Sequence, residues 1–153
     1  DATVRLVGPA GTRVLPLERF FVLPGTDHLR ETVLEDGEIL TEVLVPGAPP
    51  ESRSAYRKVR ARGSWDFALA GAAVSLATRG GVVEHVRIVL SGVAPVPWRA
   101  KGAENVIAGR TLDPSVAAQA AAAAVKGAEP LELNAYKVPM VRGIVEEALL
   151  SLA

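Results

Sequence analysis

The chain has 153 residues, about the size of one domain, and its content of 49% hydrophobic and 22% charged residues suffices for a buried core. Seventeen basic and seventeen acidic side chains cancel, which argues against nucleic acid or an anionic membrane surface as a partner. The absence of cysteine excludes disulfides, thiolate-bound zinc and any iron–sulfur cluster held by this chain. Its two histidines, His28 and His85, lack metal-ligand spacing.

No apolar run reaches the length of about 18 residues that a membrane-spanning helix needs, so we expect no membrane segment. The sequence begins at Asp1, without a methionine, a basic stretch or an apolar stretch of the kind that makes a signal peptide. We therefore expect a segment of a longer protein.

Two short β-rich runs, 4–7 and 13–17, flank a turn rich in glycine and proline, and they predict a β-hairpin. No local partner for this hairpin is visible. Because an isolated hairpin is marginal in water, we interpret it as the last piece of a preceding domain. Imperfect alternation over 38–46 predicts a half-buried strand ended by Pro46, with Ile39, Thr41, Val43 and Val45 on one side.

Three further strands are predicted over 54–62, 67–77 and 82–93. Gly80-Gly81 separates the last two and predicts a tight hairpin turn, because glycine adopts the positive φ that such turns require. The run 67–77 is rich in alanine and compatible with a helix by propensity. Its hairpin partner favours a strand.

The last third of the chain has helical patterns over 98–107, 117–126 and 134–152. Asp113-Pro114 supplies an N-cap followed by proline at the first helical position. Pro139 is tolerated only near a first turn, so the regular part of the last helix is expected to begin about there. Strands followed by helices predict an α+β fold, in which helices cover one face of an antiparallel sheet of three to four strands.

Several blocks, in this order, resemble the FAD-binding (medium) subunit of the molybdenum hydroxylase family, which includes xanthine dehydrogenase, aldehyde oxidoreductase and carbon monoxide dehydrogenase. The blocks are Leu23-Pro24-Gly25, Glu31-Thr32-Val33-Leu34, Gly37-Glu38-Ile39-Leu40, residues 55–60, residues 66–74, residues 91–100 and Asn134-Ala135-Tyr136-Lys137. Pro97-Trp98-Arg99-Ala100 is most similar to bacterial aldehyde oxidoreductase flavin subunits. The resemblance implies that residues 1–28 end an FAD-binding domain and that residues 29–153 form the C-terminal domain of the flavoprotein.

The resemblance also implies a role in a complex. In this family a large subunit carries the molybdenum cofactor, a small subunit carries [2Fe–2S] clusters, and the FAD of the medium subunit passes electrons to an external acceptor. These subunits and the missing N-terminal FAD domain are the expected partners. The glycine-rich turns that bind the FAD pyrophosphate in relatives are absent, so this chain is not expected to bind FAD unaided. A cytoplasmic location is expected, or a periplasmic one if a partner carries an export signal.

Lys58 lies on the strand that places a lysine near the isoalloxazine in relatives, where a cation would stabilise negative charge on the reduced flavin. The alternative is a solvated lysine in a basic run. Asp66 matches an acidic residue near the exposed edge of the flavin in relatives. The alternative for Asp66 is a turn cap after Gly63-Ser64.

Leu23 falls where relatives place an apolar side chain against the cofactor; simple packing between domains is the alternative. Trp65 is a candidate to shield the flavin or to contact a partner subunit. Trp98 follows Pro97 and is interpreted as a core or staple residue at a helix start, with an aromatic platform as the alternative. Ser64 and Ser91 have no histidine nearby in the sequence, so nucleophilic catalysis is not supported.

Two functional hypotheses follow. The first is a segment of an electron-transfer flavoprotein subunit that closes the FAD site and docks its partners. The second is a purely structural interaction domain without cofactor contacts. Replacement of Lys58 distinguishes them, because only the first predicts a change in the potential or retention of the flavin.

Overall fold

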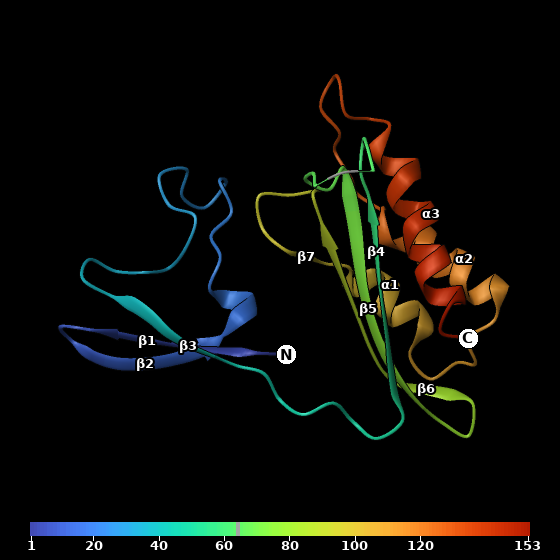
Figure 1. Cartoon of the computed structure of the whole chain (residues 1–153), viewed down its shortest axis with the longest axis horizontal. Coiled ribbons are helices and arrows are strands. Elements are labelled where there is room, and N and C mark those ends of the chain that lie inside the picture. Colours follow the sequence, from blue (N-terminus) through green and yellow to red (C-terminus); the bar gives the residue numbers. More distant parts are fainter. Residues whose placement is uncertain (64) are drawn as a thin grey trace. The chain divides into compact units, whose positions relative to one another are not determined.

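The computed structural model describes residues 1–63 and 65–153. The chain divides into two compact units, Asp1–Ala48 and Pro49–Ala153 (Figure 1). The first contains β1 (Thr3–Gly8), β2 (Gly11–Pro16), the 3-10 helix η1 (Leu17–Arg19) and β3 (Ile39–Leu44). The second contains β4 (Ser52–Val59), β5 (Ala70–Arg79), β6 (Val82–Ser91), β7 (Trp98–Arg99), α1 (Lys101–Ile107), α2 (Pro114–Ala124) and α3 (Lys137–Leu150). The domain boundary predicted between residues 28 and 29 falls inside the first unit.

The first unit is an antiparallel sheet of order β2-β1-β3. The predicted hairpin is present as β1 and β2, but the expectation that it lacks a local partner is wrong. β3 pairs with β1, with Val43 opposite Val4 and Leu40 opposite Leu6. Val4 and Leu6 are 0% exposed and form a small core with Phe20. β1 and β3 are separated in the sequence by residues 9–38, so their pairing leaves no local signal.

β3 is less buried than the predicted half-buried strand, because only Leu40 among its six residues is even partly buried. Leu40 packs against the small core, whereas Ile39 is 66% exposed and Val45 is 78% exposed. The strand itself ends before Pro46, as predicted.

The second unit is an antiparallel sheet of order β4-β5-β6-β7, in which consecutive strands are neighbours. Gly80 and Gly81 link β5 to β6 with φ of +58° and +82°, the positive values that the hairpin prediction requires. The alanine-rich run is therefore a strand, as its hairpin partner indicated.

The helices follow the sequence signals except at Trp98. Asp113 caps α2 by accepting a hydrogen bond from the Val116 amide at 2.8 Å, with Pro114 as the first helical residue. α1 begins at Lys101 rather than at Trp98, because Trp98 is paired with Leu90 of β6. The interpretation of Trp98 as a buried residue at a helix start is therefore wrong: it lies on β7 and is 45% exposed.

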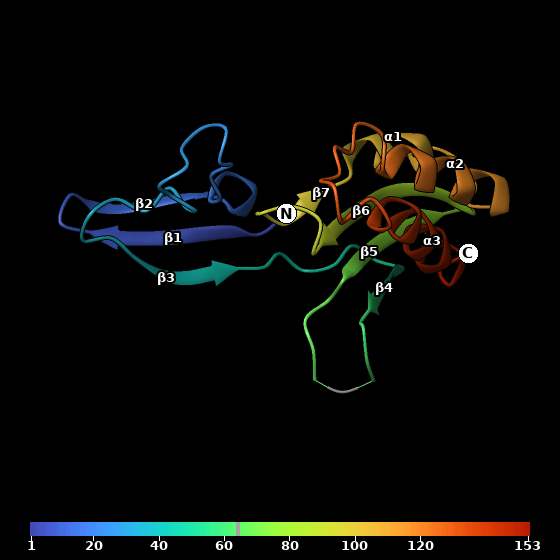
Figure 2. The ribbon, with the colours of Figure 1, turned by 90° about the horizontal axis from the view of Figure 1, so that it is seen from above.

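The core of the second unit lies between one face of its sheet and the three helices (Figure 2). β5 contributes Ala70, Ala72, Val74 and Leu76, β6 contributes Val83, Val86, Ile88 and Leu90, and the helices contribute residues such as Ile107, Ala120, Val145 and Leu149. The predicted α+β class, a sheet of four strands on three helices, is confirmed. No helix within the described residues is both long enough and apolar enough to cross a lipid bilayer.

Candidate functional site

The face of β4 that points away from the helices carries Lys58. Along this strand Ala55 and Val59 pack against the core, so the intervening Tyr56 and Lys58 project from the opposite face, where both are exposed. Across the sheet Lys58 stands opposite Gly71 of β5. Because Gly71 has no side chain, the neighbour directly beside Lys58 is bare backbone.

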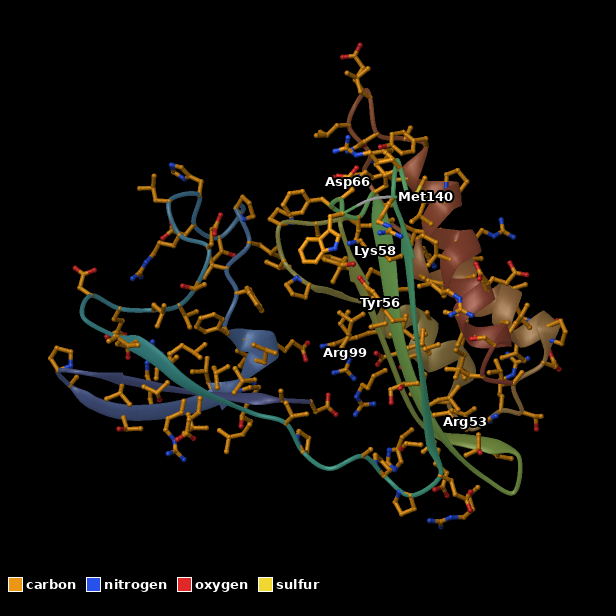
Figure 3. All side chains as sticks on the ribbon, in the orientation of Figure 1. Arg53, Tyr56, Lys58, Asp66, Arg99 and Met140 are labelled. Carbon is orange, nitrogen blue, oxygen red and sulfur yellow. The ribbon has the colours of Figure 1, made fainter. Side chains whose placement is uncertain are left out.

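Lys58 is held at the end of β4 by the main chain of Asp66. Its Nζ donates a hydrogen bond to the carbonyl oxygen of Asp66 at 2.9 Å (Figure 3). The connection between β4 and β5 is closed just beyond this point, where the Leu69 amide donates to the carbonyl of Val59 at 2.9 Å. Two of the three predicted site residues, Lys58 and Asp66, are thus brought together.

The carboxylate of Asp66 has two partners of its own. Oδ1 accepts a hydrogen bond from the amide of Phe67 at 2.9 Å, and Oδ2 pairs with Nε of Arg62 at 3.1 Å. The first contact is the local capping role that Asp commonly plays in turns. The side chain of Asp66 is 26% exposed and that of Arg62 is 72% exposed, so this ion pair is open to solvent and worth little by itself.

Exposed aromatic side chains flank Asp66. Trp65 is 100% exposed and Phe67 is 94% exposed within this chain. Large apolar side chains left in water beside a fixed cation are typical of a surface that another group covers. Ser64, considered above as a nucleophile, lies outside the described residues.

Leu23, the third predicted residue, belongs to the first unit, whereas Lys58 and Asp66 belong to the second. It is 41% exposed and opens a turn, accepting main-chain hydrogen bonds from Thr26 at 2.8 Å and Asp27 at 3.2 Å. Its exposure leaves it available for a contact with another group.

Glu104 of α1 is a buried, hydrogen-bonded carboxylate that the sequence analysis did not identify. It is 7% exposed and accepts hydrogen bonds from the Ile88 amide at 2.9 Å and from Arg99 Nε at 2.8 Å and Nη2 at 3.0 Å. These bonds satisfy a main-chain donor at the edge of β6 and fix α1 to the sheet. One sequence signal could have identified Glu104: it is a carboxylate that lies between two apolar residues, Ala103 and Ile107, of one short helix.

Within the described residues no group of three or more histidine, cysteine, aspartate or glutamate side chains could hold a metal ion. The positive-φ glycines of the described turns sit mostly in hairpins and helix ends, such as Gly11, Gly80 and Gly109. The arrangement can therefore offer a fixed cation and an apolar surface to a cofactor. It offers no cradle for a pyrophosphate among these residues.

An antiparallel sheet backed by helices on one face, with a tethered lysine on the other, defines an α+β domain that can cover a bound group. Residues 54–152 match the family model described as CO dehydrogenase flavoprotein C-terminal domain. The chain belongs to this family, and the resemblance drawn from its sequence blocks is confirmed.

Similar proteins agree with this assignment. The carbon monoxide dehydrogenase medium chain of Hydrogenophaga pseudoflava is 36% identical over 153 residues, covering 97% of this chain and 51% of the relative. The aldehyde oxidoreductase FAD-binding subunit PaoB of Escherichia coli is 40% identical over 106 residues, covering 68% of this chain and 31% of the relative.

The solved structure of Hydrogenophaga pseudoflava carbon monoxide dehydrogenase lacking the Mo-pyranopterin moiety matches with a TM-score of 0.88 at 35% identity, covering 99% of this chain and 52% of the other. This chain thus spans about half the length of the relatives that it matches over its whole extent.

Proposed function

We propose that this chain is part of the FAD-binding subunit of a molybdenum-containing hydroxylase or dehydrogenase. The second unit covers the FAD site and docks partner subunits, and residues 1–28 are the end of the preceding FAD domain. FAD, when bound, takes electrons from the iron–sulfur clusters of a small subunit and passes them to an external acceptor, while a large subunit carries the molybdenum cofactor. We place this complex in the cytoplasm.

One observation carries the proposal: Lys58 is held on the exposed face of the sheet by the carbonyl of Asp66. A flexible lysine samples many rotamers, and fixing one at a functional site costs side-chain entropy. The main-chain acceptor restricts Lys58 without neutralising its charge, because a carbonyl carries only a partial negative charge. A cation presented in this way favours negative charge on a group that covers this face.

The residues of this chain suit the isoalloxazine end of FAD and leave the pyrophosphate to the missing domain. Lys58 would supply positive charge, and the exposed rings of Trp65 and Phe67 would exclude water around it. Leu23 stays a separate prediction of an apolar contact with the cofactor. Asp66 would fix Lys58 through its carbonyl and limit the net positive charge through its carboxylate.

Replacing Lys58 with alanine in the full-length FAD-loaded subunit tests the proposal. We expect the midpoint potential of the flavin to fall by about 30 mV, the two-electron equivalent of roughly 1.4 kcal/mol of lost charge stabilisation. Arg79→Ala is the matched control, because Arg79 is a cation of the same sheet at the opposite end of β5 and its side chain is 82% exposed. A flavin potential that stays unchanged in Lys58→Ala, with only complex assembly impaired, would favour the purely structural alternative.

A further inference from the structure

Lys137, in the first turn of α3, reaches across to the connection between β6 and β7. Its Nζ donates a hydrogen bond to the carbonyl oxygen of Gly92 at 2.8 Å. Its aliphatic stem lines a cavity of about 220 Å³ beside Trp98 and Val138. Gly92 follows the end of β6 and has a φ of +71°, a left-handed conformation that favours glycine.

Gly92 lies directly against the end of the connection between β4 and β5. A Cβ atom built on Gly92 would stand 3.1 Å from the carbonyl oxygens of both Ala68 and Leu69. A side chain at this position would force the two main chains apart by a few tenths of an ångström. The identity of Gly92 is therefore explained both by its conformation and by its neighbours.

The segment 66–69 is thus held from two sides. On one side the Leu69 amide donates to the carbonyl of Val59 at 2.9 Å, which ties the segment to β4. On the other side stands Gly92, itself fixed by Lys137. The Asp66 carbonyl that holds Lys58 belongs to this same segment. The contacts form a continuous path from α3 to the ammonium group of Lys58.

We propose that Lys137 is a positioning residue for the flavin site: by fixing Gly92 it sets where segment 66–69 lies, and through the Asp66 carbonyl it sets where Lys58 points. This inference rests on the proposed function, because it assigns to Lys137 an indirect effect on the same cofactor. Lys137 makes no contact with Lys58 itself. Lys137 therefore acts on Lys58 through main-chain packing. A displacement of Gly92 is transmitted to segment 66–69 because the interior is closely packed.

The decisive variant is Lys137→Met in the full-length subunit, since methionine retains much of the apolar stem and loses the donor. Loss of this solvent-exposed hydrogen bond predicts amide exchange in residues 66–69 that is about 2–10 times faster, with and without FAD. In the FAD-loaded subunit the flavin potential should move in the same direction as in Lys58→Ala, by a smaller amount. Lys137→Arg, which restores a donor, should recover both values.

Glu147→Met is the matched control, because Glu147 is a second side chain that joins α3 to the sheet and methionine removes its acceptor. Its Oε1 pairs with Arg57 Nε at 2.9 Å, away from segment 66–69. General loosening of α3 would make this control resemble Lys137→Met and would overturn the proposal. Gly92→Ala provides a second route, since its methyl group would push against the Ala68 and Leu69 carbonyls. If Gly92→Ala does not fold, the amide exchange and flavin potential of Lys137→Met test the proposal without it.

The outcomes separate the two proposals. A flavin potential that shifts in Lys58→Ala but not in Lys137→Met overturns the role of Lys137 and leaves the proposed function standing. Unchanged exchange of residues 66–69 in Lys137→Met also overturns it. If neither variant alters the flavin, both proposals fall. A shift in both, absent from Glu147→Met, supports the path through Gly92.

Discussion

The ammonium group of Lys58 is bound by the main-chain carbonyl of Asp66, at 2.9 Å, and not by its carboxylate. The two functions of Asp66 are therefore separable. Its backbone fixes the lysine, while its side chain binds Arg62 and caps the Phe67 amide. Replacing the side chain removes a negative charge and leaves the acceptor for Lys58 in place.

Asp66→Asn should therefore have an effect opposite in sign to that of Lys58→Ala. If Asp66 lies at the flavin site as proposed, removing its negative charge should raise the midpoint potential of the flavin, because reduction then meets less repulsion. Stability should change by less than about 1 kcal/mol, since the Arg62 pair is exposed. Redox titration of the FAD-loaded subunit measures the shift. Arg62→Ala, which removes the ion pair and keeps the carboxylate, is the control; a fall in potential for Asp66→Asn would contradict the assignment.

Gly71→Ala should destabilise the second unit. A Cβ there would lie 2.7 Å from Ser91 Oγ, 3.1 Å from the Arg57 carbonyl oxygen and 3.3 Å from the Tyr56 hydroxyl. Overpacking of this kind costs about 1–3 kcal/mol, measurable by urea unfolding. The double variant with Ser91→Ala should recover part of the loss, because it removes the nearest atom.

Gly143→Ala is the control for Gly71→Ala. Gly143 lies within α3, and a Cβ there meets nothing within 4 Å. Because glycine is a poor helix former, this substitution should stabilise the protein by about 0.5–1 kcal/mol. Equal destabilisation by both substitutions would show that crowding at Gly71 is not the cause.

Glu104→Ala should be among the most destabilising single changes in the second unit. It leaves the Ile88 amide without its carboxylate acceptor and removes both contacts with Arg99. Loss of a buried charged acceptor costs on the order of 2–4 kcal/mol. Urea unfolding checks this value against Glu132→Ala, an exposed site where less than about 0.5 kcal/mol is expected. A loss below about 1 kcal/mol would mean that water replaces the carboxylate.

The first unit should lose stability in acid through Glu38. The Arg13 guanidinium donates to both carboxylate oxygens, at 2.7 and 2.6 Å, and lowers the pKa of Glu38 from its ordinary 4.5 to about 2. A lowered pKa in the folded state means a contribution that is fully present above pH 4.5 and is lost as the pH falls towards 2.

The titration of Glu38 can be followed by carboxyl NMR, with Glu38→Gln to assign the signal. The stability difference between the parent chain and Glu38→Gln should shrink across that same acid range. A Glu38 carboxyl that titrates near 4.5 would show that the contact with Arg13 is not maintained in solution.

Local chemistry determined much of this fold from the sequence. Gly80-Gly81 predicted the β5–β6 hairpin because only glycine accepts two successive positive φ values readily, and Asp113-Pro114 predicted the start of α2 through a cap and a fixed φ. The family resemblance named Lys58 and Asp66, and the sequence predicted a strand over 54–62 that carries Lys58.

Only the tertiary structure decided what depends on contacts between distant segments. Trp98 joins the edge of β6 as a strand, β3 completes the sheet of the first unit, and Glu104 satisfies the Ile88 amide. The hydrogen bond from Lys137 to Gly92 joins α3 to the connection between β6 and β7. Propensity and periodicity report the preferences of neighbouring residues, whereas strand pairing and buried hydrogen bonds follow from which surfaces the packed chain brings together.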